Sequence, residues 1–176
     1  PYNGVIPKLE FDHNTGLLWI GSDGTSVKTF NPQTGVVTNN YTVNGLVNNE
    51  NGGDIAIAKS GQMYLANFSG LYSIQPSGNT LQATRISAEN FPFQLTSLGV
   101  GSNGMLYSCT NEGNSKMLMI DPADGAYTVV KQFNHKVNDL GSYLAPVSSL
   151  DTTDTDGDGV IDVLDCFPDD STSTSE

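Results

Sequence analysis

Acidic side chains crowd one short segment near the C-terminal end of this 176-residue chain. In the twelve residues 154–165, carboxylates stand at positions 1, 3, 5, 9 and 12, and Gly159 stands at position 6. A hard cation such as calcium takes about 6 to 8 oxygen ligands, and alternate side chains of a tightly turned loop can converge on one ion. The spacing therefore predicts a Ca²⁺ site. Its ligands would be five carboxylates and one backbone carbonyl, from Asp154, Asp156, Asp158, Val160 (the carbonyl), Asp162 and Asp165.

The alternative for this segment is a solvated acidic linker. Five carboxylates so close together would repel one another strongly without a divalent cation, so we expect Ca²⁺ to order the segment. An EF-hand would need a helix on each side of the loop. Gly, Pro and a Ser/Thr run precede it and Pro168 follows closely, so paired helices are not expected.

The acidity of the chain belongs mostly to this tail. Nineteen Asp and Glu against seven Lys and Arg give a net charge of −12, and nine of the acids lie in 151–176. Such a chain, with no basic cluster, would repel phosphate backbones and anionic lipid heads, so nucleic acid is not an expected partner. No apolar run approaches the roughly 20 residues that a membrane-spanning helix needs, so direct membrane insertion is not expected either. The chain begins at Pro1 without a Met or an export segment, and we expect it to be a piece of a larger protein.

The first 133 residues contain three similar segments, 9–41, 55–86 and 98–133. Four landmarks keep the same order in each: a turn glycine, an aromatic residue three positions later, a hydrophobic-x-Pro step and a second glycine. The landmarks are Gly16, Trp19, Phe30-Asn31-Pro32 and Gly35; Gly61, Tyr64, Ile74-Gln75-Pro76 and Gly78; and Gly104, Tyr107, Ile120-Asp121-Pro122 and Gly125. A period of about 43 to 45 residues is typical of β-propeller blades.

Each copy reads as four short strands separated by Gly, Asn, Asp and Pro turns. In the first copy the expected strands are 9–12, 17–21, 27–30 and 36–43. The predicted fold is all-β, with three blades of four antiparallel strands and an irregular calcium-binding C-terminal linker. We expect a partial propeller over 1–146, with blades at about 5–45, 51–90 and 94–134, and one more inner strand within 137–146. A linker over 147–153, the calcium loop over 154–170 and a flexible tail over 171–176 would follow.

The run Gly16-Leu17-Leu18-Trp19-Ile20-Gly21, followed by Phe30-Asn31-Pro32, resembles the repeats of two-component regulator propellers and related NHL-like propellers. The resemblance covers about 5–133 and implies architecture more than activity. Three blades cannot close a ring, because closed propellers use roughly 4 to 8. We therefore expect the remaining blades to lie N-terminal in a parent protein, or on other chains. The alternative is an open stack of three sheets with an exposed edge, which proteins normally avoid.

The acidic loop, extended through Cys166-Phe167-Pro168, resembles a thrombospondin type 3 repeat. That resemblance implies that Asp154, Asp156, Asp158, Asp162 and Asp165 are ligands and that Cys166 is the cysteine of the repeat. It also implies a calcium-rich, extracellular or cell-surface setting. The join of the two modules suggests a bacterial cargo of type IX secretion.

Other chemistry-bearing residues predict little by themselves. Cys109 is expected to be a small buried residue, with a bridge to Cys166 left open, and His13 and His135 are expected to be solvated. The three repeated aromatic residues are expected to pack between blades. A set of four acids could meet at a central funnel: Asp23, Asp54, Glu112 and Asp121.

Two functions remain open. The first is a non-enzymatic, secreted or cell-surface recognition and adhesion module, with a protein or glycan ligand at the propeller face and a calcium-rigidified linker. The second is a propeller hydrolase or lyase with a metal in its central channel. The mostly neutral Asn, Ser and Thr side chains suit binding better than acid–base chemistry, and the first reading is favoured.

Overall fold

A computed structural model describes residues 8–22, 25–47, 53–142 and 155–156. The chain divides into two compact units, Pro1–Leu144 and Ala145–Glu176. Only Thr155 and Asp156 of the second unit are described, so the fold below is that of the first. The described residues form strands, turns and irregular segments, and they contain no helix long and apolar enough to span a membrane.

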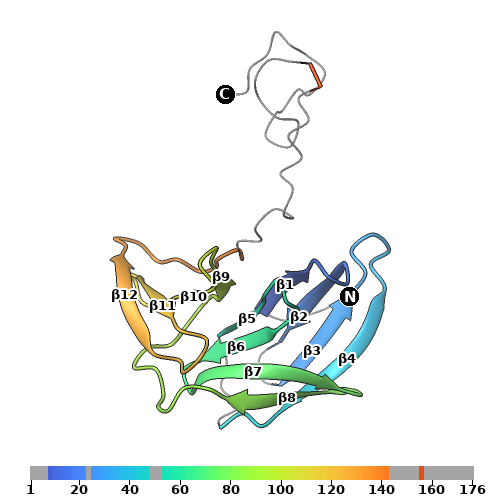
Figure 1. Ribbon diagram of the computed structural model, residues 1–176, viewed down its shortest axis with the longest axis horizontal. Helices are drawn as coiled ribbons and strands as arrows, with labels where there is room; N and C mark the ends of the chain where they lie inside the picture. The colour runs from blue at the N-terminus through green and yellow to red at the C-terminus, as the bar shows by residue number, and fades with distance from the viewer. Residues whose placement is uncertain (1–7, 23–24, 48–52, 143–154, 157–176) are drawn as a thin grey trace. The chain divides into compact units, whose positions relative to one another are not determined.

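The first unit is built from three four-stranded antiparallel blades, which are β-propeller blades (Figure 1). Blade 1 comprises β1 (Lys8–Asp12), β2 (Leu17–Gly21), β3 (Ser26–Phe30) and β4 (Val37–Asn44). Blade 2 comprises β5 (Asp54–Ile57), β6 (Met63–Asn67), β7 (Gly70–Ser77) and β8 (Thr80–Arg85). Blade 3 comprises β9 (Gly99–Val100), β10 (Leu106–Cys109), β11 (Lys116–Ile120) and β12 (Tyr127–Gln132).

The first strands of the blades are the inner strands, since β1 contacts β5 and β5 contacts β9. The outer strands of blades 1 and 2 also meet, because β4 pairs in parallel with β8 over three residues. This parallel pairing was not predicted. It occupies backbone groups that two outer strands would otherwise leave unpaired.

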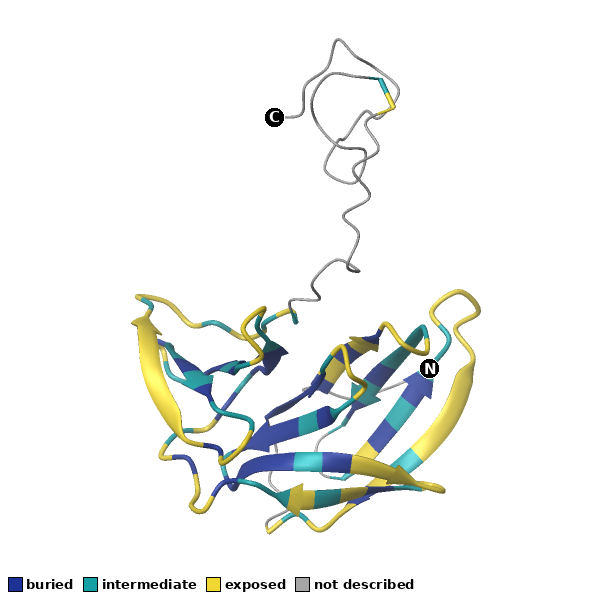
Figure 2. Ribbon diagram, in the orientation of Figure 1, coloured by how far each residue is buried: buried dark blue, intermediate teal, exposed yellow. Residues whose placement is uncertain are grey.

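Two apolar cores lie between the blades, and Figure 2 shows buried residues along the facing strands. The core between blades 1 and 2 contains Trp19, which stacks on Tyr41 with ring centroids 5.3 Å apart. Tyr64 packs against the core between blades 2 and 3. The predicted packing of the repeated aromatics between blades is confirmed for these two. Tyr107 belongs to neither core and lies on the face of blade 3 that points away from blade 2.

The segment that follows blade 3 does not form the expected strand in its described part, 137–142. Its irregular backbone is held instead by side chains. Val137 accepts a hydrogen bond from Thr96 Oγ1 at 2.9 Å through its carbonyl, and its N–H donates to Ser115 Oγ at 2.9 Å. Asn138 to Ser142 continues toward the inner strands, and 143–146 lie outside the described residues.

Candidate functional site

One buried carboxylate joins the inner strands of all three blades. Asp54 opens β5 and is 2% exposed. Its Oδ1 accepts the backbone N–H groups of Leu9 (3.2 Å) and Ile55 (2.8 Å), and its Oδ2 accepts that of Leu98 (3.0 Å). Burial raises the pKa of Asp54 well above its usual range, and these three hydrogen bonds oppose that rise. A carboxylate so fully occupied ties blades together and has little capacity left for substrate.

A second buried acid on the inner strand of blade 1 meets the segment that follows blade 3. Glu10 is 7% exposed, and its Oε1 accepts a hydrogen bond from Ser142 Oγ at 2.8 Å. Burial raises the pKa of Glu10, while hydrogen bonds from Ser142 and from the backbone of Ile57 lower it. Asp139 adds a weaker electrostatic repulsion to both Glu10 and Asp54. The hydrogen bond from Ser142 fastens the end of this segment to the inner strand of blade 1.

Of the four acids that could meet at a central funnel, the three that the structure describes, Asp54, Glu112 and Asp121, are not brought together. Asp54 is occupied as described, and Asp23 lies outside the described residues. Glu112 precedes β11 and pairs with Lys116 at 3.0 Å, which lowers its pKa, whereas Asp121 follows the far end of that strand and caps a turn. Within the described ranges, no group of three or more His, Cys, Asp or Glu side chains is arranged to hold a metal ion.

The remaining single candidates behave as ordinary structural residues. Cys109 is fully buried, and burial raises the pKa of its thiol, so a reactive thiolate is disfavoured. His13 and His135 are exposed, as predicted. Cys166 lies outside the described residues, so the open question of a bridge to Cys109 stays open.

The predicted calcium loop falls almost entirely outside the described residues. Asp154, Asp158, Val160, Asp162 and Asp165 are among those not described, and only Asp156 is described, with a half-buried side chain. The prediction of a calcium site there therefore rests on the oxygen ligands that the sequence supplies. Five carboxylates and a turn glycine at calcium-loop spacing suit a hard cation with flexible, oxygen-rich coordination.

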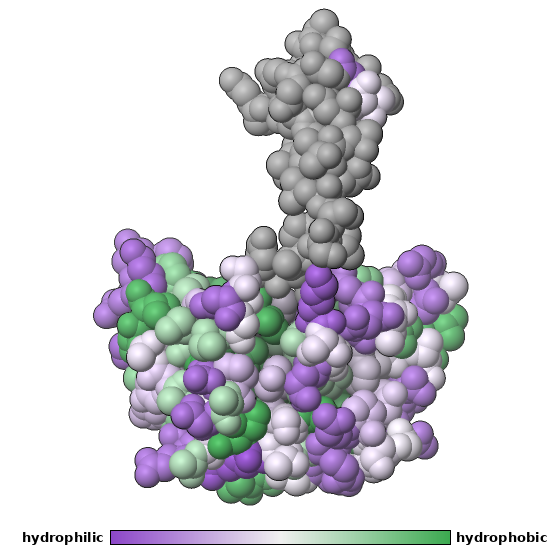
Figure 3. All heavy atoms as spheres, in the orientation of Figure 1, coloured by the Kyte–Doolittle hydropathy of each residue, from purple (hydrophilic) through white to green (hydrophobic). Residues whose placement is uncertain are grey.

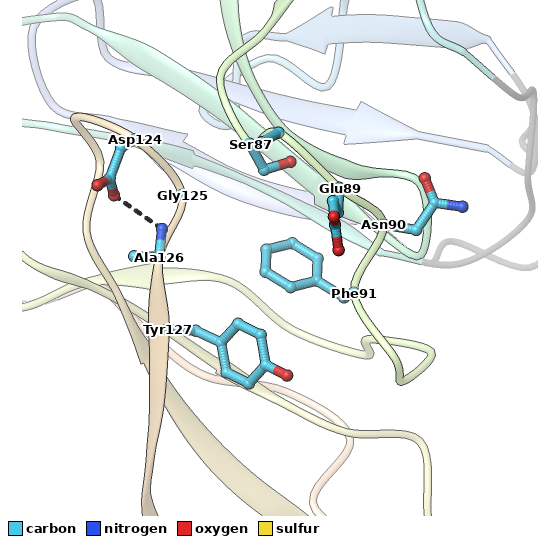
Figure 4. Close-up of a pocket in the computed structure, with 9 residues that line it drawn as sticks. Ser87, Glu89, Asn90, Phe91, Asp124, Gly125, Ala126 and Tyr127 are labelled. Carbon is cyan, nitrogen blue, oxygen red and sulfur yellow. Dashed lines mark hydrogen bonds between the residues drawn. The ribbon is translucent and has the colours of Figure 1, made fainter.

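A hollow between blades 2 and 3 has the character of a binding site (Figure 4). Its volume is about 420 Å³, and it is lined by the connection from β8 to β9 and by the turn from β11 to β12. Tyr127, 37% exposed, presents its ring to the hollow, and Phe91, 2% exposed in the core, supports it edge-on with ring centroids 5.7 Å apart at 70°. Glu89 and Asp124 supply exposed carboxylates around it, whereas Asn90 Oδ1 already accepts a hydrogen bond from Arg85 at 2.9 Å.

The local structure of this hollow follows from its loops. Gly125 packs so closely on Ser87 that a Cβ there would lie 2.6 Å from the serine Cβ. Ser87 Oγ is itself held, because it accepts the N–H of Leu71 at 3.0 Å. Asp124 Oδ1 accepts the N–H of Ala126 at 2.8 Å, a bond drawn in Figure 4. The hollow was missed from the sequence, where the only signal was an acid, an amide and an aromatic in consecutive loop positions, 89–91.

Comparisons with known proteins establish the fold alone. The chain resembles a Bacteroides thetaiotaomicron protein of unknown function, with a TM-score of 0.57 and 17% identity over 78% of this chain and 42% of that one. It also resembles the computationally designed Ika4 protein, with a TM-score of 0.50 and 13% identity over 79% of this chain and 80% of that one. The chain spans less than half the length of the first three solved structures that it resembles. Neither a protein-family model nor a curated protein sequence matches it.

Proposed function

We propose that this chain is a non-enzymatic recognition module of an exported, extracellular or cell-surface protein. The hollow between blades 2 and 3 carries this proposal, because it joins the exposed ring of Tyr127 to carboxylate oxygens on loops that the packed blades hold in place. The two buried acids near the axis support a binding role. Asp54 is fully engaged by backbone N–H groups, and Glu10 by Ser142 and Ile57.

Of the two ligand classes expected, protein and glycan, the chemistry of the hollow favours a glycan without negative charge. The exposed ring of Tyr127 can pack on the C–H groups of a sugar ring, while the carboxylate oxygens of Glu89 and Asp124 accept hydrogen bonds from its hydroxyls. Glu89 and Asp124 would repel an anionic ligand. Adhesion through such a site is the function that these residues support best.

An array carrying neutral oligosaccharides, anionic oligosaccharides and peptides tests this binding role. We expect binding to neutral oligosaccharides that falls at least tenfold, or about 1.4 kcal/mol, in Tyr127→Ala. Val129→Ala is the matched control, since Val129 is an exposed residue of the same strand and lies outside the hollow. Cleavage of a bound oligosaccharide would contradict the non-enzymatic role and favour a propeller hydrolase or lyase. Binding that is unchanged in Tyr127→Ala would exclude the hollow.

We further propose that Ca²⁺ bound by the loop at 154–165 stiffens the linker that follows the blades. Calcium should bind more tightly than magnesium, which prefers strict octahedral geometry and retains its water. Titration calorimetry on the whole chain should show calcium-dependent heat, and limited proteolysis should show protection of 151–170. Asp156→Asn with Asp158→Asn should weaken binding at least tenfold, about 1.4 kcal/mol. Asp151→Asn with Glu176→Gln removes the same charge outside the loop and should change binding little. No heat and no protection at millimolar calcium would refute the site.

A further inference from the structure

Blade 1 exposes an apolar sheet face on the side opposite its core. The strand register places six apolar side chains on that face, namely Leu9, Phe11, Leu18, Ile20, Phe30 and Val37. Lys28 lies among them, opposite Ile20, and polar residues of β3 and β4 lie toward the outer edge. Leu9 is 45% exposed, Phe11 38% and Val37 40%, and the other three are half-buried. An exposed apolar patch on a folded protein is typical of a surface on which another protein or another sheet packs.

The equivalent face of blade 2 is buried, because blade 1 packs against it. Register pairs make Ile55 the counterpart of Leu9, Ile57 of Phe11, Met63 of Leu18, Leu65 of Ile20 and Ile74 of Phe30. These five residues of blade 2 are between 1% and 5% exposed. They belong to the core that contains Trp19 of blade 1. In this repeat, then, the apolar face of one blade packs against the aromatic face of the blade before it.

Blade 3 leaves the complementary half of that contact open. Tyr107 occupies the repeat position of Trp19 and Tyr64, and it shares its face with Met117 and Met119. All three side chains are half-buried and lie outside both interblade cores. Figure 3 shows hydrophobic residues reaching the surface over blade 3. The two ends of the blade series thus display the two halves of a contact that the chain already makes twice.

Two hollows lie at the inner ends of these open faces. One, of about 310 Å³, is bounded by Leu9, Phe11 and Leu18 on blade 1 and by residues 139–142. The other, of about 220 Å³, is bounded by Tyr107 and Met117 on blade 3 and by Leu140 and Gly141. Ser142 holds this segment on the inner strands, since its Oγ donates to Glu10 and accepts the N–H of Val100. Side chains from a docking blade therefore have space to enter beside both faces.

We propose that the apolar face of blade 1 is the docking site for blade 3 of a second copy of this chain. Tyr107 of one copy would pack on Phe11 and Leu18 of the other, as Trp19 packs on blade 2 within the chain. The reciprocal contact, related by a two-fold axis, would join the remaining pair of faces. The resulting ring has six blades, within the range of roughly 4 to 8 that closed propellers use. This inference is independent of the glycan and calcium proposals.

Sedimentation equilibrium and light scattering on the whole chain test the assembly. We expect a reversible dimer across a concentration series. A carboxylate placed on either face should raise the dissociation constant at least tenfold, because it would have to be buried unpaired. Phe11→Glu alters the blade 1 face and Tyr107→Glu the blade 3 face. Val37→Glu is a milder second variant of the blade 1 face, at a residue already 40% exposed. Gln82→Glu is the control, since Gln82 is exposed on β8 of blade 2 and should leave the dimer intact.

The pattern among variants separates this docking from other forms of association. If blade 1 faces paired with each other, Tyr107→Glu would remain a dimer, and the proposal would be wrong. A mass that grows without limit as concentration rises would show an open polymer and would overturn the closed ring. A monomeric wild-type chain at every concentration would overturn the docking site itself. Mixing Phe11→Glu with Tyr107→Glu should restore some pairing, because one contact in each mixed pair is intact. Circular dichroism spectra matching the wild type would show that the variants are folded.

Discussion

A single buried carboxylate, that of Asp54, links three blades through hydrogen bonds to their main chains. Asp54 accepts backbone N–H groups from the inner strands of blades 1 and 2 and from Leu98, directly before the inner strand of blade 3. Each of these donors is a main-chain group that would otherwise need water or another acceptor. The free-energy cost of burying the charged carboxylate is reflected in the raised pKa of Asp54. The residue therefore stabilises the contact of three blades at the expense of a charge held out of water.

Replacing this carboxylate should destabilise the blades. Asp54→Ala leaves the N–H groups of Leu9, Ile55 and Leu98 without their acceptor, and each buried unsatisfied group costs about 1–3 kcal/mol. We expect the free energy of unfolding in urea to fall by at least about 2 kcal/mol. The exposed Asp124→Ala is the control and should change it by less than about 1 kcal/mol. Equal stability of the two variants would contradict the bridging role.

The same residue predicts the direction of a pH effect. A pKa raised in the folded state means that the fold binds its proton more tightly than the unfolded chain does. The stabilisation from this group is therefore fully present below the ordinary pKa of an Asp and is lost as pH rises through the raised value. Glu10 acts in the same direction. We expect the melting temperature of the blades to rise as pH is lowered from 7 toward 5, and to rise less in Asp54→Asn and Glu10→Gln. An identical pH slope in the wild type and both variants would count against it.

Turn glycines of the elements differ in what surrounds them. Gly16, in the turn from β1 to β2, has a φ of +70°, and a Cβ there would meet nothing within 4 Å. Gly53, directly before β5, has a φ of +71°, but a Cβ there would collide with the carbonyl oxygen of Ala66. Both glycines have nearly the same left-handed φ. Only Gly53 must also lack a side chain, because the backbone of Ala66 on β6 lies close to it.

A matched pair of alanine variants separates these two requirements. Gly16→Ala pays only for the left-handed backbone, about 1–2 kcal/mol. Gly53→Ala should cost about 1–3 kcal/mol more, because the strand must also shift away from Ala66. Urea unfolding of both variants measures the difference. If Gly16→Ala were as harmful as Gly53→Ala, close approach at β5 would not be the deciding factor.

In the molecule as a whole, the environment of a repeated residue depends on which blade carries it. Trp19 is 6% exposed inside the core between blades 1 and 2, whereas its counterpart Tyr107 is half-buried on an open face. The two occupy the same place in the repeat. Only the presence of a following blade within the chain distinguishes them.

Truncating these two aromatics should therefore have unequal effects. Trp19→Ala should lower the free energy of unfolding by about 3–5 kcal/mol, as truncation of a core Trp does. Tyr107→Ala should lower it by about 1 kcal/mol or less in dilute solution, where chains are separate. Urea unfolding followed by circular dichroism is the measurement, since Trp19 is the only tryptophan. A loss at Tyr107 as large as that at Trp19 would mean that the face of blade 3 is already covered within one chain.

The sequence by itself determined the local structure of the blades. The strands expected in the first copy, 9–12, 17–21, 27–30 and 36–43, lie within one residue of β1 to β4 at each end. The repeated glycines and the hydrophobic-x-Pro steps delimited the strands because turn geometry depends on neighbouring residues. The same repetition indicated the propeller blades, since a landmark that recurs in register implies a recurring unit.

Only the tertiary structure decided which distant residues meet. Leu98 lies 44 residues from Asp54, and Ser142 lies 132 residues from Glu10, yet each pair is joined by a hydrogen bond. For this reason the sequence did not show that Asp54, Glu112 and Asp121 lie apart, that 137–142 is irregular, or that Tyr107 lies outside the interblade cores while Trp19 and Tyr64 do not. The local sequence pattern specifies which residues form turns and which side chains alternate between the two faces of a strand. The packing of one blade against the next decides which of those faces is buried. The hollow beside Phe91 and the open face of blade 1 both arise from that packing.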